Sequence, residues 1–308
     1  MSFSDKLKKV FRAPGKIPMN ILYRLPFIAN RMSDEKYLKF IFRFAMGKKL
    51  NLENPRSFSE KQQWLKIYDR RPEYTTMVDK YEAKLYVAEK IGGEYIVPTL
   101  GVWDKFDDID FDSLPERFVL KCTHDSGGLV ICRDKSKLDI QAARKKIEHS
   151  LKTEFFYVGR EWPYKNVKPR IIAEKYLEDA DNADMIDYKF YCFNGVPKFL
   201  YVSQGLENHA TAHISYVTMD WEIAPFRRTD YANFEQLPPC PRCFEKMKEF
   251  AGILSKDIPF SRIDFYDING KLYFGEITFF PGSGLSPFEP KEWDEKIGGW
   301  IKLPPKNV

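Results

Sequence analysis

The chain has 308 residues, 49 basic and 44 acidic side chains, and a net charge of +5. No apolar run approaches the roughly 20 residues that a membrane-spanning helix needs, and the charged first 15 residues lack the apolar core of a secretory signal. Five cysteines in a chain of this length favour a reducing compartment, so we expect a cytoplasmic protein of one large or two smaller domains.

The first 50 residues are expected to form a basic helical extension. Twelve basic and three acidic side chains give this segment a net charge of +9, against +5 for the whole chain. Residues 34–47 have the spacing of one amphipathic helix. A stripe of Phe3, Leu7, Val10 and Phe11 among lysines is found in helices at a membrane interface, but it favours a packed or solvated cap. A peripheral contact with the inner membrane face therefore stays open.

Two further segments follow the extension. Residues 51–74 are expected to be a helical connector, and residues 75–308 the main domain, in which strands and helices alternate as in an α+β fold. A helix within residues 77–98 is predicted to begin at Asp79, an N-cap three residues before Glu82. Two successive glycines end this helix.

A pair of lysines and a glycine loop stand out in the main domain. Lys80 and Lys84 lie one turn apart on the predicted helix and so point the same way. Residues 116–132 predict a strand, a glycine loop and a second strand, with Lys121 at the end of the first strand. The loop contains Ser126, Gly127 and Gly128. Backbone N–H groups of such a loop can approach phosphate oxygens, although no Gly-Lys-Ser/Thr of a Walker loop follows.

Residues 261–284 predict a β-hairpin that runs into a Pro-Gly turn. The apolar side chains that alternate along it are Ile263, Phe265, Tyr273, Ile277 and Phe279. Two types of turn are possible at the tip of this hairpin. A two-residue turn would pair Ile268 with Lys271, whereas a longer loop with a glycine bulge would pair Asp267 with Lys271.

The choice of turn decides which side chains share a face. The two-residue turn would place Asp264 and Glu276 on opposite faces, whereas the longer loop pairs Arg262 with Glu276. We expect the longer loop, because it collects Arg262, Asp264, Glu276 and Thr278 on one face. Two carboxylates and a hydroxyl suit Mg²⁺, and an arginine beside them can stabilise phosphate charge. The alternative is an ordinary hairpin with a surface salt bridge.

Five segments, in order along the chain, resemble a known family. They are residues 54–70, the helix that opens at Asp79-Lys80, and residues 114–122, 187–195 and 274–284. In these segments the chain resembles the TupA-like branch of the ATP-grasp family, which is associated with bacterial surface polysaccharide synthesis. The resemblance covers roughly residues 50–303. It implies an α+β ATP-grasp fold that clamps a nucleotide between two subdomains, with ATP and Mg²⁺ as cofactors.

The resemblance also implies a role for each matching residue. The ATP phosphates would meet Lys80, Lys121 and the loop residues Ser126, Gly127 and Gly128. The adenine edge would meet Glu174 and the backbone of Lys175, Tyr176 and Leu177, within a hinge at residues 170–179. Asp187 would bind the ribose hydroxyls. Mg²⁺ would be held by Asp264, Glu276 and Thr278. Arg262, facing the transferred phosphoryl group, and Lys121 would be the catalytic residues.

Two residues depart from the family pattern. Thr278 stands where most ATP-grasp enzymes have asparagine, although a hydroxyl can also ligate Mg²⁺. Asp125 lies in the glycine loop, close to where phosphates should bind. We therefore expect its side chain to point outward or to meet a substrate amine.

The general chemistry of the family is carboxylate activation, in which ATP phosphorylates a carboxylate and an amine attacks the acylphosphate. We expect an ATP-dependent carboxylate–amine ligase that attaches an amino acid or peptide to a uronic acid of a surface glycan, with no nucleic-acid partner. One alternative is a glycosyltransferase or sugar kinase of polysaccharide synthesis, and another is a binding protein with a decayed ATP site. The intact Lys80, Lys121, Asp264 and Glu276 argue against decay.

Cys240 and Cys243 form a single CxxC motif between prolines. Zinc would need two more ligands, and the motif has neither a second cysteine pair nor a histidine pair nearby in the sequence. We favour a structural or incidental role over a metal or redox role.

Overall fold

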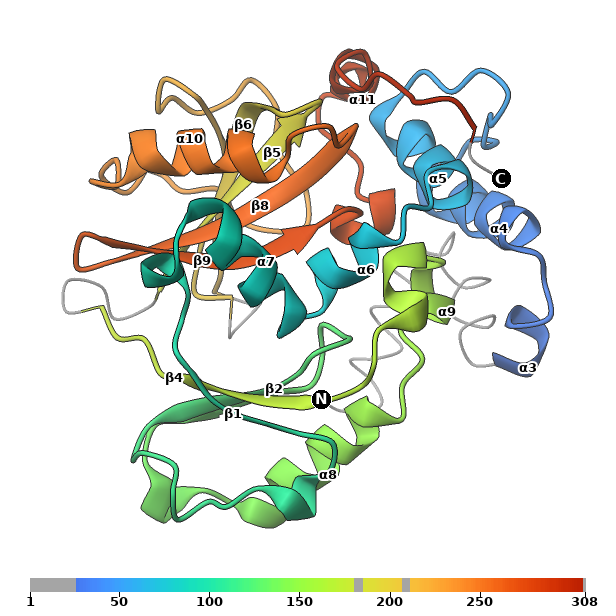
Figure 1. Cartoon of the computed structure of the whole chain (residues 1–308). Coiled ribbons are helices and arrows are strands. Elements are labelled where there is room, and N and C mark those ends of the chain that lie inside the picture. Colours follow the sequence, from blue (N-terminus) through green and yellow to red (C-terminus); the bar gives the residue numbers. More distant parts are fainter. Residues whose placement is uncertain (1–25, 180–184, 207–210, 307–308) are drawn as a thin grey trace. The chain divides into compact units, whose positions relative to one another are not determined.

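The computed structural model describes residues 26–179, 185–206 and 211–306 (Figure 1). The chain divides into two compact units. Unit 1 comprises Met1–Arg70, Phe156–Trp162 and Phe280–Val308, and unit 2 comprises Arg71–Phe155 and Pro163–Phe279. The division expected from the sequence ran instead at residues 50 and 74, and it kept the C-terminal residues with the main domain.

Unit 1 is helical in its described part. Its elements are α3 (Pro26–Ala29), α4 (Asp34–Met46), α5 (Phe58–Tyr68), α9 (Phe156–Gly159), the short 3₁₀ segment η6 (Pro281–Gly284) and α11 (Glu292–Gly298). The amphipathic helix predicted at residues 34–47 is confirmed as α4, which Ser33 caps at its start and Gly47 ends in the left-handed region. A capping box of Ser57 and Glu60 opens α5.

A buried lysine ties the segments of unit 1 together. Lys66 on α5 is 1% exposed, and its Nζ donates to the carbonyls of Gly159 and Ser283, both at 2.8 Å. Burial lowers the pKa of Lys66 to about 8, although Glu161 opposes that shift. The lysine thus joins three stretches of chain that lie far apart in the sequence. None of the helices in the described ranges has the length and apolar character that a bilayer span requires.

Unit 2 begins with two helices and contains two antiparallel sheets (Figure 1). The helices are α6 (Glu73–Val78) and α7 (Glu82–Ile91), followed by the 3₁₀ segment η2 (Gly93–Tyr95). Asp79 caps α7 as expected, because its Oδ1 accepts from the N–H groups of Tyr81 and Glu82 at 2.8 and 3.2 Å. The capping box is not completed, since the Glu82 carboxylate binds Arg170 at 2.9 Å.

The first sheet has the order β1-β4-β2-β3. Its strands are β1 (Thr99–Trp103), β2 (Phe118–Cys122), β3 (Leu129–Cys132) and β4 (Ile171–Lys175). The helix α8 (Ile140–Leu151) covers one face, where Phe118, Leu120 and Ile147 are fully buried. Because strand side chains alternate, Val119 and Lys121 point to the opposite face. The 3₁₀ segments η3 (Phe106–Asp108), η4 (Lys135–Lys137) and η5 (Trp162–Asn166) complete the connections.

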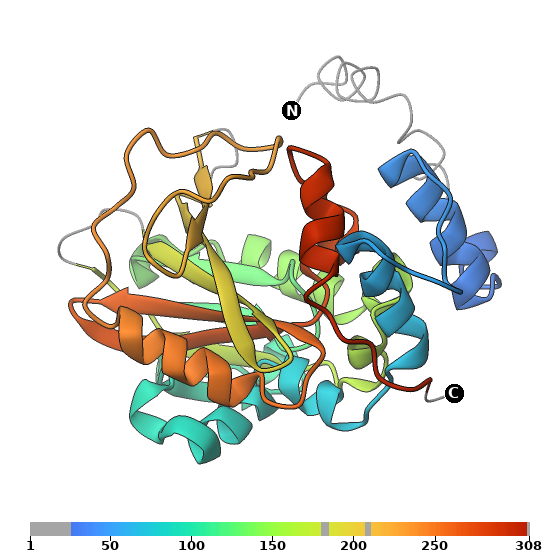
Figure 2. The ribbon, with the colours of Figure 1, turned by 90° about the horizontal axis from the view of Figure 1, so that it is seen from above.

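The second sheet has the order β7-β6-β5-β8-β9. Its strands are β5 (Ile186–Phe193), β6 (Val196–Gln204), β7 (His213–Thr218), β8 (Phe260–Ile268) and β9 (Lys271–Thr278). The helix α10 (Phe244–Leu254) packs along one face of this sheet, beside β5, β6 and β8 (Figure 2). That face is apolar and includes Phe190 and Phe265, both fully buried. Polar side chains therefore gather on the other face.

The tip of the β8–β9 hairpin differs from our prediction. Ile268 pairs with Lys271, so the turn is the two-residue Asn269-Gly270 turn that we had rejected. Both turn residues have positive φ, 54° and 78°, which suits a tight hairpin turn and explains the preference for Asn-Gly there. The predicted pairing of Asp267 with Lys271 is wrong, and Asp267 pairs with Leu272.

A β-bulge restores the predicted face. The register shifts between Ile263 and Phe265, where β9 contributes one extra residue opposite Asp264. Beyond it Arg262 pairs with Thr278, not with Glu276. On the tip side of the bulge, the two-residue turn pairs Phe274, rather than the predicted Tyr273, with Phe265 on the apolar face. The turn and the bulge each shift the register by one residue in the same direction, and a total shift of two residues preserves the face. The acidic side chains therefore share a face although the predicted turn was wrong.

Candidate active site

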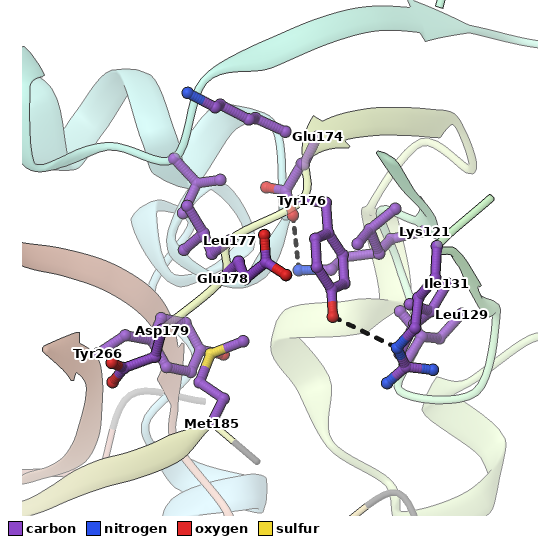
Figure 3. A pocket seen from close by; sticks show the side chains of 14 residues that line it. Lys121, Leu129, Ile131, Glu174, Tyr176, Leu177, Glu178, Asp179, Met185 and Tyr266 are labelled. Atoms are coloured by element: carbon purple, nitrogen blue, oxygen red, sulfur yellow. Dashed lines mark hydrogen bonds and ion pairs between the residues drawn. The ribbon is translucent and has the colours of Figure 1, made fainter. Parts of the chain in front are cut away.

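A pocket of about 300 Å³ lies in unit 2, between the uncovered face of the first sheet and Tyr266 of the second (Figure 3). Its apolar walls include Val119, Leu129 and Ile131, and its floor reaches Lys121 and Glu174. Residues 175–179, which leave β4, line one side. The pocket therefore contains every residue of the predicted adenine subsite: Glu174, Lys175, Tyr176 and Leu177.

Glu174 holds two lysines at the inner end of this pocket. Its Oε1 lies 2.5 Å from Lys84 Nζ. Its Oε2 lies 2.6 Å from Lys121 Nζ (Figure 3). Burial alone would raise the pKa of Glu174, but the two ammonium groups hold it down to about 2. Lys84 also donates to the Val97 carbonyl at 2.8 Å. The carboxylate thus fixes Lys121 on the pocket floor.

Lys80 joins this cluster from the start of α7. Its Nζ donates to the backbone carbonyl of Asp125 in the glycine loop. Burial lowers the pKa of Lys80, and the carboxylates of Glu276 and Asp125 partly offset that shift. Burial alone would also lower the pKa of Lys121, but the negative charges of Glu174 and Glu276 outweigh the effect of burial and raise that pKa. Both lysines therefore lie within electrostatic reach of the acidic hairpin.

The glycine loop is held by Asp125, whose orientation differs from our prediction. Asp125 points inward, is 5% exposed, and accepts from the Gly128 N–H at 3.1 Å and from the Ser150 hydroxyl. A Cβ on Gly128 would lie 2.4 Å from Ser150 Oγ, so no larger residue fits there. Ser126 and Gly127 are exposed at the tip of the loop. The Gly128 N–H is engaged inside the protein, which leaves Ser126 and Gly127 as the outward part of the loop.

Arg262 gathers the acidic side chains of the hairpin. Its Nη2 lies 2.7 Å from Asp264 Oδ2, 2.7 Å from Glu276 Oε1 and 3.0 Å from Thr278 Oγ1. Three oxygens from two strands therefore converge on one point, which a guanidinium nitrogen holds. A positive charge is thus favoured at this point, as the predicted metal site requires.

The two carboxylates respond differently to this environment. Asp264 is fully buried, and burial raises its pKa although Arg262 and Lys189 oppose the shift. Glu276 keeps 44% of its side chain exposed. Burial of its carboxyl works against the charged form, but Arg262, Lys189 and Lys80 outweigh it and hold the pKa of Glu276 at about 2. Glu276 is therefore the carboxylate that stays charged most readily.

Lys189 is a residue of this site that our sequence reasoning missed. It lies opposite Asp264 on the neighbouring strand, and its Nζ is 3.0 Å from Asp264 Oδ2 and 2.9 Å from Asp187 Oδ1. Asp187 and Lys189 alternate with buried residues along β5, a period-two pattern that could have revealed a second cation on the polar face. Lys189 connects the predicted ribose residue to the predicted metal site.

The chain matches a family model described as TupA-like ATP-grasp over residues 60–302. The chain belongs to this family. Its α+β architecture, with two sheets and a pocket beside the hinge, is the ATP-grasp fold that the sequence predicted. No protein of curated function matches the sequence.

Solved ATP-grasp structures resemble the chain only distantly. D-alanine–D-alanine ligase from Helicobacter pylori has 15% identity and a TM-score of 0.41, with 79% of this chain and 69% of that chain covered. The Bacillus anthracis ligase complexed with ATP has 14% identity and a TM-score of 0.37, with 71% and 55% covered. The ATP-grasp ligase PsnB, complexed with a precursor variant, Mg and ADP, has 9% identity and a TM-score of 0.41, with 87% and 66% covered. The chain thus matches little more than half to two thirds of their lengths.

The donor set of this ATP-grasp chain fits a magnesium ion. Two carboxylates and a hydroxyl supply hard oxygen ligands, and water or phosphate oxygens commonly complete such a site. In the described ranges no group of three or more histidine, cysteine or carboxylate side chains is placed to hold a metal ion, so the metal would need other oxygen ligands as well. Arg262 would have to withdraw its Nη2 from the point where the three oxygens meet.

The two cysteines of the CxxC motif differ in their exposure. Cys240 is exposed, and Cys243 is partly buried with its Sγ 3.2 Å from the Gly270 carbonyl. Partial desolvation raises the pKa of both thiols, which disfavours the thiolate form. The hydrophobic stripe predicted at residues 3–11 lies outside the described residues.

Proposed function

We propose that this protein is an ATP-dependent carboxylate–amine ligase that acts through an acylphosphate. One observation carries the proposal. Lys121 on the first sheet and Lys80, just before α7, are within electrostatic reach of Glu276 on the second sheet, beside a pocket lined by the hinge. This arrangement suits a nucleotide whose base lies in the pocket and whose phosphates extend toward the acidic hairpin.

The proposed nucleotide contacts follow from this geometry. The backbone of Lys175–Leu177 would meet the adenine edge, and Asp187 the ribose hydroxyls. Lys80, Lys121 and the outward residues Ser126 and Gly127 would neutralise the phosphates. Glu174 acts indirectly, because it holds Lys121 in position from 2.6 Å away.

Asp264, Glu276 and Thr278 would hold Mg²⁺, which supplies charge neutralisation at the phosphates. Arg262 and Lys189 lie beside these ligands, so they would stabilise the charge of the phosphoryl group as it moves. The protein's contribution is therefore positioning and electrostatics, and no side chain needs to become covalently modified.

The proposed reaction has two balanced steps. A carboxylate oxygen of the acid substrate bonds to the γ-phosphorus as the bond to the bridging oxygen breaks, and ADP leaves. The amine nitrogen then bonds to the acyl carbon, the bond from that carbon to the phosphate oxygen breaks, and phosphate leaves. The amine gives up a proton, so the products are an amide, ADP and phosphate.

For the substrates, we propose a uronic acid in a bacterial surface glycan and an amino acid or peptide as the amine. Support comes from the TupA-like family model and from the resemblance in five segments of the sequence. We also propose a cytoplasmic location with peripheral contact to the inner membrane face. The net charge of +9 over residues 1–50 and the exposed Lys36, Lys39 and Arg43 on α4 support this contact.

The test is a coupled assay with purified protein, Mg-ATP, uronic acids and amino acids. ADP release that requires both an acid and an amine, with an amide product seen by mass spectrometry, is expected. AMP and pyrophosphate would contradict the acylphosphate route. ADP release with a sugar hydroxyl as the only acceptor would instead identify a sugar kinase.

A further inference from the structure

The polar face of the second sheet continues beyond the candidate metal site to a second arginine. Lys189 lies opposite Tyr201 on β6, and Tyr201 lies opposite Tyr216 on β7. Lys189 Nζ is 6.0 Å from the centre of the Tyr201 ring, and Arg228 Cζ is 5.8 Å from the same centre. The two cations therefore approach one tyrosine ring and cannot be farther apart than the sum of these distances.

Arg228 belongs to a segment, residues 224–232, that we call the flap. Both ends of the flap are hydrogen-bonded to the edge strand β7. The Ala224 N–H donates to the Tyr216 carbonyl at 2.9 Å, and the Ala232 carbonyl accepts from the Ile214 N–H at 2.8 Å. Between these anchors Phe226 is 5% exposed and packs on the Tyr216 ring at 5.2 Å. The backbone near Arg228 is thus held over the polar face of the sheet.

The guanidinium of Arg228 already binds a carboxylate in the geometry that a substrate would use. Its Nε and Nη2 lie 2.9 and 2.6 Å from the two oxygens of Asp230. The arginine side chain is 17% exposed, whereas that of Asp230 is 55% exposed. The guanidinium of Arg228 is therefore mostly buried, and its partner Asp230, two residues later in the same flap, is the more exposed of the two.

We propose that Arg228 is the recognition site for a carboxylate of the substrate, and that Asp230 occupies this site until the substrate displaces it. The proposal rests on the proposed ligase function and names a second contact for the acidic substrate. Arginine forks bind carboxylates through two parallel hydrogen bonds, so a substrate carboxylate can replace the Asp230 carboxylate without a change in the arginine.

The position of Arg228 limits which carboxylate it binds. Lys189 on β5 and Arg262 on β8 lie beside the proposed point of phosphoryl transfer. The segment that carries Arg228 is instead anchored to the edge strand β7, which β6 separates from β5. The carboxylate at Arg228 is therefore not the one that becomes phosphorylated. It belongs to an acidic group farther along an extended substrate, as in a glycan with successive uronic acid units.

The test measures binding without turnover. Digalacturonate, with two carboxylates, and galacturonate, with one, are titrated calorimetrically into the full-length protein in the presence of Mg-ADP. Digalacturonate should bind more tightly than galacturonate to the wild type. Arg228→Gln should weaken digalacturonate binding about tenfold or more, because a charged hydrogen-bonding partner is lost. The affinity of Arg228→Lys for digalacturonate should lie between those of the wild type and Arg228→Gln, since lysine keeps the charge but cannot form the two parallel hydrogen bonds of arginine.

Asp230→Asn provides the decisive comparison, because it should tighten digalacturonate binding several-fold by removing the internal competitor. A purely structural ion pair predicts that neither variant binds better than the wild type. Arg117→Gln is the matched control, since this arginine is 49% exposed and pairs with the exposed Glu178. It should leave the affinity unchanged.

The outcomes separate this inference from the ligase proposal. If Arg228→Gln and Asp230→Asn both bind digalacturonate as the wild type does while ADP release persists, the carboxylate site is wrong and the ligase function stands. If no acid and amine elicit ADP release but the two variants shift affinity in opposite directions, the site stands without the ligase function. If neither probe binds the wild type or Asp230→Asn, the inference is overturned.

Discussion

The buried carboxylate of Glu174 offers the sharpest test of how the nucleotide pocket is held together. Its side chain is 7% exposed and bridges Lys84 and Lys121 at 2.5 and 2.6 Å. Glu174→Gln keeps the shape and removes the charge, so two ammonium groups lose their shared partner. Breaking a buried ion pair on one side typically costs about 3–5 kcal/mol of unfolding free energy.

The lowered pKa of Glu174 gives a second estimate of how much this carboxylate contributes to the free energy of unfolding. Burial opposes its charged form, but Lys121 and Lys84 hold its pKa at about 2, compared with an ordinary value of 4.5. This difference corresponds to on the order of 3 kcal/mol of stability at neutral pH. Because the folded pKa is lowered, the contribution is complete above pH 4.5 and is lost as the pH falls through about 2.

The assay is urea-induced unfolding of wild type and Glu174→Gln at pH 7 and at pH 3.5. The variant should be less stable by about 3 kcal/mol at pH 7, and the gap should shrink by more than about 1 kcal/mol at pH 3.5. Glu178→Gln is the matched control on the same hinge. Its side chain is 61% exposed and pairs with an exposed arginine, so its loss should cost less than about 1 kcal/mol.

Two results would refute this reasoning. If Glu174→Gln is no less stable than Glu178→Gln at pH 7, the buried triad does not stabilise the fold. If the gap between wild type and Glu174→Gln is the same at both pH values, the carboxylate is not held in its charged form by the two lysines.

Three further predictions concern the nucleotide, the glycine loop and the N-terminus. Glu276→Ala should reduce ADP release at least a hundredfold, because it removes one of the proposed metal ligands; turnover near the wild-type rate would rule out the metal site. Amide hydrogen exchange in residues 123–128 should slow on addition of saturating Mg-ATP, and unchanged exchange would contradict the phosphate-loop assignment. Binding to anionic vesicles should weaken steeply with salt and fall when residues 1–16 are deleted, while ligation of a soluble acceptor survives, since each basic residue near the surface contributes about 1 kcal/mol. A deletion variant that binds vesicles as well as the full chain would refute the membrane role of that segment.

The sequence predicted the acidic face of the hairpin but not the path of the chain that forms it. Alternation of polar and apolar residues indicated that Arg262, Asp264, Glu276 and Thr278 belong together, and their contacts confirm it. The pattern could not locate the irregularity, because an extra residue at the tip and an extra residue along the strand have the same effect on which residues share a face.

Two other residues show where local patterns are insufficient. Asp125 turned inward because Ser150, 25 residues later, supplies a hydrogen-bond donor that no local pattern reveals. Lys189 was missed because its importance depends on β5 lying next to β8, which places it opposite Asp264. Both are consequences of strand and helix neighbours that only the folded chain brings together.

The bulge in β9 also couples the length of the turn to the position of the acidic side chains. Gly275 lies against Asp264, where an added Cβ would be 3.1 Å from the Asp264 carbonyl oxygen. Removing this residue would shift Glu276 and Thr278 to the face of α10, unless the tip gained one residue in compensation. An insertion in the turn and a deletion at the bulge would therefore be tolerated together where each alone would disassemble the site, so paired length changes are the route by which such a hairpin can diverge without losing its acids.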